Sequence, residues 1–179
     1  MAVEEPRLST LLVCTHNATE STAGDAAATR ALVETVSDLL QKKVAAAKGN
    51  KKVLVVACGG KRDWRNELSE GEIVLRELTR AVGIETFAPA AARATLEVEG
   101  RSKCLEDAAR NAASMLALGS RLARVSSMTV VCGSDARAEV RRVFSYHFPG
   151  VNIDVAAPKR AAADDDAPDA SPKRRRRGA

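Results

Sequence analysis

Aromatic residues are scarce in this chain: Phe, Trp and Tyr make up 3% of its 179 residues. A hydrophobic core must therefore consist mainly of Ala, Val and Leu, and a chain of this length can bury one without disulfides or a structural metal. No apolar run approaches the roughly 20 residues that a membrane-spanning helix needs. The acidic stretch Met1–Pro6 lacks the apolar segment of a signal peptide. These absences predict a soluble intracellular protein.

Closely spaced cysteine pairs are also missing. The four cysteines lie far apart in the sequence: Cys14, Cys58, Cys104 and Cys132. This spacing does not match common zinc sites, so we expect no metal site. Three cysteines end predicted buried strands, where we expect reduced thiols packed as small apolar side chains. Cys58, near Lys61 and Arg62, is the one position where a nucleophilic thiol would fit.

Most of the chain has no excess of one charge, although the net charge is +5. The segment from Pro158 onward holds seven of the 28 basic and four of the 23 acidic residues, which leaves 21 basic and 19 acidic residues in the body. A nucleic-acid-binding body is therefore not indicated. We expect an α/β domain over residues 1–157 and a disordered basic tail over residues 158–179.

The tail contains two basic clusters separated by twelve residues. They consist of Lys159 and Arg160, then Lys173, Arg174, Arg175, Arg176 and Arg177. This layout is typical of a bipartite signal bound by a nuclear import receptor, and it predicts a protein of the nucleus and cytoplasm. The alternative is a tail that binds nucleic acid through phosphates.

Apolar strand patterns alternate with helical patterns along the body. The predicted strands cover Leu11–Cys14, Val53–Ala57, Ile84–Pro89, Ala94–Val98, Met128–Cys132 and Val151–Val155. Four helices are predicted. The first carries Leu32 to Leu40, and the second follows the capping box Ser69–Glu72 and ends at Gly83. The other two run from about Cys104 to Arg124 and from about Asp135 to Tyr146. This alternation predicts a three-layer α/β/α Rossmann-like sandwich with a mostly parallel sheet.

Small, polar and cationic residues follow the predicted strands. They include His16 after the first strand, Gly59, Gly60 and Lys61 after the second, Glu99 and Ser102 after the Ala94 strand, and Ser134 and Arg137 after the Met128 strand. In a parallel sheet these loops meet at one edge, where helix N-termini favour anions. We therefore expect a pocket for a small anionic ligand.

Each of these residues also has a simpler interpretation. Gly59 and Gly60 could form a tight turn without a ligand, and Lys61 could be a solvated surface charge. A capping box accounts for Ser69 and Glu72, which leaves Glu70 unassigned. Within the pocket hypothesis, Gly59, Gly60 and Lys61 would hold the anionic group, Glu99 and Ser102 would bind a sugar or amine, and Glu70 or His16 would transfer a proton.

Three segments resemble the YdcF/SanA/ElyC-like family. The run from Glu99 to Ala108 is similar to the family's Glu-x-x-Ser-x-Thr-x-Glu-Asn-Ala signature. Upstream, Cys58-Gly59-Gly60 and Ser69-Glu70-Gly71 are similar to its Ser-Gly-Gly and Ser-Glu-Ala elements. Downstream, the stretch from Val131 to Phe144 is similar to its Val-Thr-Ser segment. The resemblance spans about Leu11 to Pro158 in consistent order.

The resemblance implies a Rossmann-like domain that binds a nucleotide-like ligand, S-adenosylmethionine being one possibility, without an agreed reaction. It implies these site residues: Gly59, Gly60, Glu70, Glu99, Ser102, Glu106 and Asp107. Cys104 and Asp107 replace the family's Thr and Asn, and Ala136 stands near the family's His. If that His is catalytic in the family, its replacement here favours an alternative function, a non-enzymatic nuclear interaction protein on the same fold.

Overall fold

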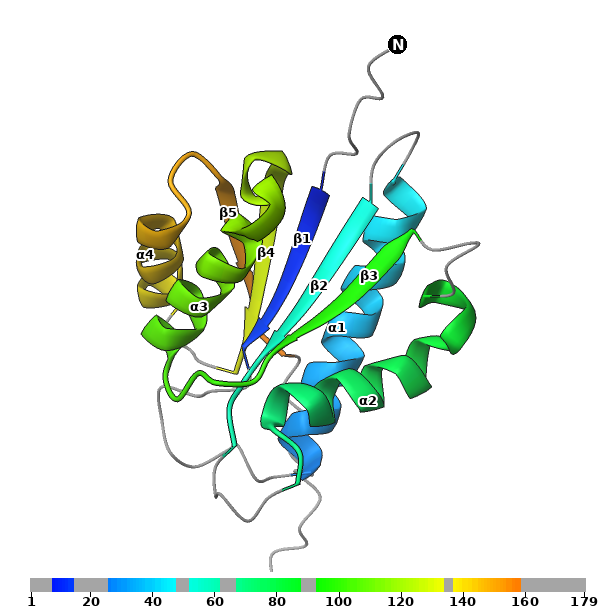
Figure 1. Ribbon diagram of the computed structural model, residues 1–179. Helices are drawn as coiled ribbons and strands as arrows, with labels where there is room; N and C mark the ends of the chain where they lie inside the picture. The colour runs from blue at the N-terminus through cyan, green and yellow to red at the C-terminus, as the bar shows by residue number, and fades with distance from the viewer. Residues whose placement is uncertain are drawn as a thin grey trace, which may run out of the picture.

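The protein folds around one five-stranded sheet flanked by helices (Figure 1). This computed structural model describes residues 8–14, 26–47, 52–61, 67–87, 93–133 and 137–158, without the side chains of residues 26–28 and 119. The strands are β1 (Leu8–Cys14), β2 (Lys52–Cys58), β3 (Ala94–Glu99), β4 (Val125–Cys132) and β5 (Asn152–Ala156). The α-helices are α1 (Ala26–Ala46), α2 (Glu70–Val82), α3 (Leu105–Ala117) and α4 (Arg137–His147). Predicted residues His16 and Ser134 and the basic clusters of the tail lie outside the described residues.

All neighbouring strands are parallel, in the order β3-β2-β1-β4-β5. β2 illustrates why these segments form strands: its residues Val53 to Cys58 are all buried, and β-branched side chains pack well on a pleated surface. Right-handed connections between parallel strands require intervening helices on the faces of the sheet. The predicted Rossmann-like α/β class is confirmed.

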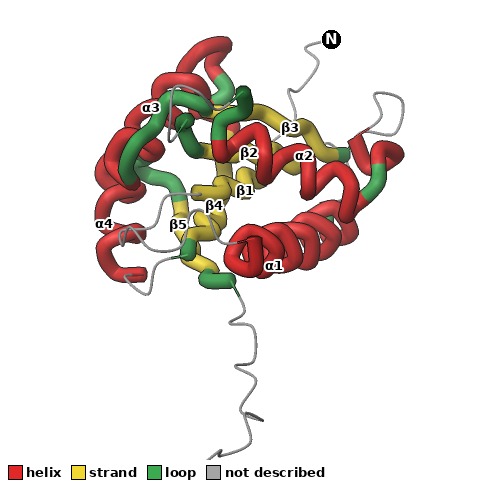
Figure 2. Tube along the Cα trace, turned by 90° about the horizontal axis from the view of Figure 1, so that it is seen from below, coloured by secondary structure: helices red, strands yellow, loops and turns green. Residues whose placement is uncertain are grey.

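Helices cover both faces of the sheet (Figure 2). α1 and α2 pack on the face that carries Leu11, Val55 and Val131, whereas α3 and α4 pack on the face that carries Leu12 and Val56. Adjacent residues of one strand contribute to different cores because strand side chains alternate between faces. The architecture is therefore the three-layer sandwich that the alternating pattern predicts.

The predicted strand Ile84–Pro89 is wrong over its described part. Residues Ile84–Phe87 form a 3₁₀ helix, and Ile84 is 74% exposed. This turn directly follows Gly83, whose positive φ of 86° ends α2. The edge of the sheet is instead formed by β3, which lies further along the chain.

Several boundaries also differ from the predictions. β1 and β4 begin three residues earlier than predicted, at Leu8 and Val125. The helix predicted to reach Arg124 ends at Ala117 and is followed by two 3₁₀ turns, Leu118–Ser120 and Leu122–Arg124. Ser120 has φ 58°, a left-handed conformation that a continuing α-helix cannot include.

Candidate functional site at the carboxyl edge of the sheet

The carboxyl ends of four strands form one continuous edge. The strand register places Cys132 beside Cys14, Cys14 beside Cys58, and Cys58 beside Glu99. This edge is the lower end of the sheet in Figure 1, and Figure 2 is seen from that side. The segments predicted to line a pocket therefore start from a common rim, and Gly60 lies close to Glu99 as that prediction requires.

The order of the strands reverses between β1 and β4. The chain proceeds from β1 outward to β2 and β3, and then crosses to β4 and β5 on the other side of β1. β1 and β4 are neighbouring strands, and the helices that follow them in the sequence, α1 and α4, pack on opposite faces. In open α/β sheets, this reversal point creates the crevice in which ligands usually bind.

Gly59 and Gly60 connect β2 to the segment that follows β3. The Gly59 N–H donates to the Glu99 carbonyl at 2.9 Å, and the Gly60 N–H donates to the Ser102 carbonyl at 2.8 Å. A Cβ atom on Gly60 would lie 2.6 Å from that same Ser102 oxygen. Glycine is required here because the two segments approach too closely for any side chain. Both backbone donors are used inside the protein.

The first turn of α2 is closed in the same way. The amides of Glu70 and Gly71 donate to the carbonyls of Gly60 and Gly59, each at 3.1 Å. Ser69 and Glu72 form the predicted capping box: the Ser69 amide donates to the Glu72 carboxylate at 2.6 Å, and the Glu72 amide donates to the Ser69 hydroxyl at 3.3 Å. The amides of residues 69–72 are thus all satisfied within the chain.

The Glu72 carboxylate is stabilised in its ionised form by this capping box. The hydrogen bond from the Ser69 backbone is the largest cause, the Ser69 hydroxyl adds to it, and together they lower the pKa of Glu72. The adjacent Glu70 is buried at the helix start. The α2 N-terminus therefore serves the internal structure of the site and offers no spare amide in residues 69–72 to an anion.

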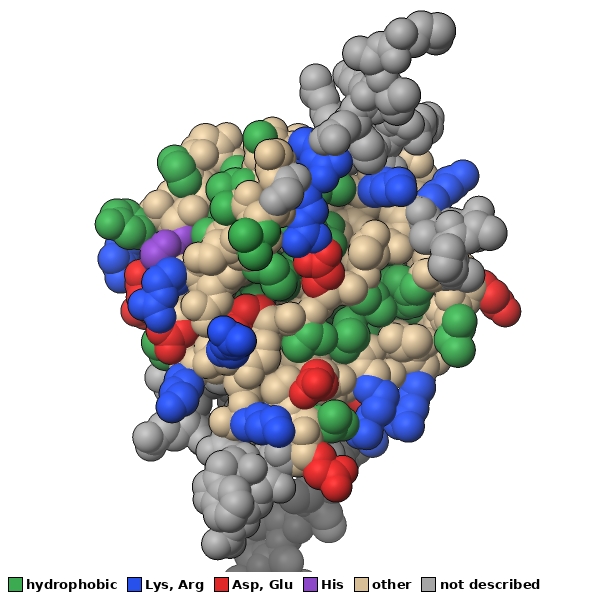
Figure 3. All heavy atoms as spheres, in the orientation of Figure 1, with side chains coloured by type: hydrophobic (Ala, Val, Ile, Leu, Met, Phe, Trp, Pro, Cys, Tyr) green, Lys and Arg blue, Asp and Glu red, His purple; other side chains and the backbone are tan. Residues whose placement is uncertain are grey.

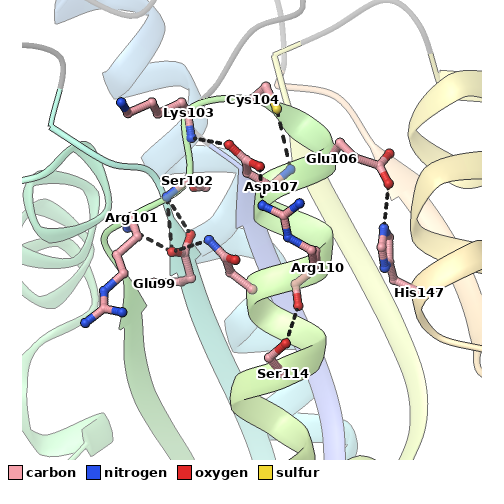
Figure 4. Close-up of polar contacts among 11 residues, drawn as sticks. Glu99, Arg101, Ser102, Lys103, Cys104, Glu106, Asp107, Arg110, Ser114 and His147 are labelled. Atoms are coloured by element: carbon pink, nitrogen blue, oxygen red, sulfur yellow. Dashed lines mark hydrogen bonds and ion pairs between the residues drawn. The ribbon is translucent and has the colours of Figure 1, made fainter.

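Glu99 organises the turn between β3 and α3 (Figure 4). Its carboxylate is part of a residue only 6% exposed, and it accepts hydrogen bonds from the Arg101 amide at 2.8 Å, the Ser102 amide at 3.1 Å and the Asn111 side chain at 3.1 Å. Three donors compensate for the desolvation of this buried charge. Glu99 and the fully buried Ser102 thus hold the rim together.

Asn111 is a member of this network that the sequence analysis missed. It lies on α3 next to the buried residues Ala108 and Ala112, within the stripe that faces the sheet. A polar side chain in such a stripe needs a buried partner. A polar residue at position 111 between the apolar residues of this stripe is the sequence signal that could have identified Asn111.

Glu106 and Asp107 lie in the first turn of α3 and contact other parts of the chain. The Glu106 carboxylate lies 2.7 Å from Nε2 of His147 on α4. Asp107 accepts from the Lys103 amide at 3.3 Å and pairs with Arg110 at 2.6 Å. These contacts fix the start of α3 and its packing on α4.

Cys104 takes the N-cap position of α3. Its sulfur accepts the Asp107 amide at 3.5 Å, which is the role that a Thr hydroxyl usually plays at this position. Cys104 therefore provides a side-chain cap at this helix start, although sulfur is a weaker acceptor than oxygen.

Exposed cations surround this rim. Lys61 follows β2, Arg101 and Lys103 follow β3, and Arg137 begins α4, and all four are exposed. Acidic side chains lie among them, including exposed Glu72 and Glu106. Figure 3 likewise shows basic and acidic side chains interspersed on the face toward the viewer. The charge can attract a small anion locally but forms no broad basic face in this view.

Three thiols lie beneath the rim. Cys14, Cys58 and Cys132 are buried in adjacent strands, whereas Cys104 is exposed. A hydrogen bond with Cys58 and burial raise the pKa of the Cys14 thiol well above its ordinary value. A reactive thiol needs partial exposure, so the burial of these three cysteines, including the predicted nucleophile Cys58, indicates a packing role. Within the described segments, no three His, Cys, Asp or Glu side chains form a group that could hold a metal ion.

Comparison of the chain with models of protein families, with curated proteins and with solved structures found no match. None of the described helices is long and apolar enough to cross a lipid bilayer.

Proposed function

We propose that this protein binds a nucleotide-like or phosphorylated small molecule in the crevice between the carboxyl ends of β1 and β4. The observation that supports this most strongly is the reversal of strand order between these two strands. The resemblance to the YdcF-like family provides the ligand class and makes S-adenosylmethionine one of the compounds to test. The reaction, if there is one, is left open.

The internal hydrogen bonds suggest how the roles divide in this site. Four of the predicted site residues donate to or accept hydrogen bonds from one another, and we assign them to the frame of the crevice: Gly59, Gly60, Glu99 and Ser102. Ligand contacts then fall to the segments after Cys14 and Cys132, which contain His16 and Ser134. Arg137 begins the helix that follows β4 and supplies positive charge beside the crevice.

A thermal-shift screen tests this proposal on the full chain. Nucleotides, S-adenosylmethionine and sugar phosphates are compared, and a ligand present at one hundred times its dissociation constant should add about 2.7 kcal/mol of stability. Arg137→Ala should weaken binding, whereas Arg142→Ala, at another exposed position of α4, should leave it unchanged. The absence of any shift across the three compound classes would refute the proposal.

A second candidate function is a non-enzymatic nuclear interaction protein. The internal use of the Glu99 carboxylate favours it, because the same motif then needs no ligand to explain it. Ala136 near the family's His and the basic tail point in the same direction. Replacing the five cations from Lys173 to Arg177 by Gln in a fluorescent fusion tests it: loss of nuclear accumulation is expected, and unchanged accumulation would contradict it.

A further inference from the structure

A second group of polar side chains lies far from the carboxyl edge, on the face of the sheet that carries α1. Ser9 is the second residue of β1, and Lys43 lies in the last turn of α1. The Lys43 ammonium donates to the Ser9 hydroxyl at 3.3 Å, and the hydroxyl oxygens of Ser9 and Ser127 are 3.5 Å apart. A serine, a lysine and a second serine thus meet at the amino end of the sheet.

Lys43 occupies a position where the helix would ordinarily have an apolar residue. It follows the buried Val36 by seven residues and the buried Leu40 by three, so all three lie on the stripe that faces the sheet. Lys43 is only partly exposed. Burial lowers the pKa of its ammonium, and Asp154 on β5 offsets part of this effect. Lys43 therefore loses its proton more readily than a surface lysine.

An irregularity in the sheet places Ser127 opposite Ser9. Leu8 pairs with Val125 and Ser9 pairs with Ser127, so Ser126 is an extra residue in β4 at this point. The Ser126 hydroxyl donates to the Leu8 carbonyl at 3.3 Å. Bulges of this kind redirect neighbouring side chains and occur often beside active sites.

This side of the sheet is accessible next to β5. Ser9, Lys43 and Ser127 are each partly exposed, and Asn152 and Asp154 on β5 are exposed. The helix that packs beside β5, α4, contributes its buried residues to the opposite face. Among the described residues, this exposed side of β5 is the direction from which we expect a small molecule to reach the Ser9 hydroxyl.

We propose that Ser9 and Lys43 form a nucleophile and general-base pair for acyl transfer from small activated esters. The same pairing of residue types supports covalent catalysis on unrelated folds. When the Lys43 amine is neutral, the 3.3 Å contact lets the Ser9 hydroxyl donate its proton to Nζ. This activity is independent of the ligand site proposed above, which lies at the other end of the strands.

The reaction proceeds in two balanced steps. Oγ of Ser9 bonds to the acyl carbon while its proton passes to Nζ of Lys43, the bond from the acyl carbon to the leaving oxygen breaks, and Lys43 returns the proton to that oxygen. Water then attacks the acyl carbon of the Ser9 ester while Lys43 takes the water proton, the bond from the acyl carbon to Oγ breaks to release the carboxylic acid, and Lys43 delivers the proton to Oγ of Ser9. No oxidant or reductant is needed.

The test uses p-nitrophenyl acetate with the full chain. Release of p-nitrophenol is followed by absorbance, and peptide mass spectrometry locates the acetyl group, which is expected on Ser9. Lys43→Met should slow acetylation of Ser9 by about 100-fold or more, in the range of general-base effects. Lys42→Met, at the exposed neighbouring position, should leave it unchanged. Equal Ser9 acetylation rates in the wild type and Lys43→Met, or acetylation confined to lysines, would overturn the proposal.

A variant at position 9 itself provides an independent readout of the same pair. Ser9→Cys retains the size of the side chain, and its thiol should be alkylated by iodoacetamide several-fold faster than in the double variant Ser9→Cys with Lys43→Met. The rate is read at the peptide that contains position 9, so alkylation of Cys104 does not interfere. Equal alkylation rates would show that Lys43 does not activate this position.

Discussion

The contact between Gly60 and Ser102 makes Gly60→Ala the sharpest test of the frame around the carboxyl edge. The added Cβ would lie 2.6 Å from the Ser102 carbonyl oxygen, well inside the ordinary contact range of 3.4–4 Å. The obstacle is backbone, so it cannot rotate away as a side chain could. Relief requires the segments after β2 and β3 to separate, which also stretches the 2.8 Å hydrogen bond between Gly60 and Ser102.

The expected cost follows from these two effects. Overpacking a close contact costs about 1–3 kcal/mol, and a lost hydrogen bond adds about 1 kcal/mol. Gly60→Ala should therefore lower the free energy of unfolding by about 2–4 kcal/mol and Tm by roughly 5–15 °C for a domain of this size. Urea unfolding followed by circular dichroism measures the first quantity, and calorimetry measures the second.

Gly100→Ala is the matched control, because its added Cβ would meet the Ser69 hydroxyl at 3.2 Å, which is a side-chain atom that can shift. We expect it to cost less than half as much as Gly60→Ala. If Gly60→Ala unfolds at the wild-type temperature, the two segments are not packed as described and the frame of the site is wrong.

Three further predictions address the carboxylates and the thiols of the same region. Glu99→Gln should destabilise the fold by about 1–3 kcal/mol in urea unfolding, because a neutral amide oxygen is a weaker acceptor for the three donors on Oε1 and the amide NH2 would face the Ser102 amide, which contacts Oε2 at 3.3 Å; an unchanged midpoint would contradict its assigned role. Because the pKa of Glu72 is lowered in the folded state, its ionised carboxylate stabilises the fold. This contribution is fully present above the ordinary pKa of a glutamate and is lost as the pH falls through the lowered pKa of the folded state. Glu72→Gln should therefore lose less stability on acidification than the wild type. Of the four thiols, a thiol-specific chromogenic reagent should label Cys104 rapidly in the native protein and the three buried cysteines only on unfolding; rapid labelling of more than one would contradict their burial.

Local patterns made much of the fold predictable. The spacing of Ser69 and Glu72 predicts the capping box, because both partners lie within four residues. The apolar run from Val53 predicts a strand buried on both faces, because its side chains are apolar on both sides of the strand. These predictions depend on neighbours in the sequence, and the structure confirms them.

The remaining features depend on contacts between distant segments. Ile84–Phe87 and Ala94–Glu99 both lie in segments with a predicted strand pattern, but only Ala94–Glu99 pairs with β2. The partners of Glu99 include Asn111, twelve residues away, and those of Lys43 lie on two different strands, β1 and β5. A single sequence identifies the polar residues that need partners but does not identify the partners.

A ligand that binds where the strand order reverses would cover the chain beyond β1 and β4. Hydrogen exchange of the full chain, with and without a ligand from the thermal-shift screen, locates the bound ligand. We expect increased protection in the segments that follow Cys14 and Cys132, on the two strands that flank the reversal. Protection confined to the amino ends of the strands, or to the edge strands β3 and β5, would contradict it.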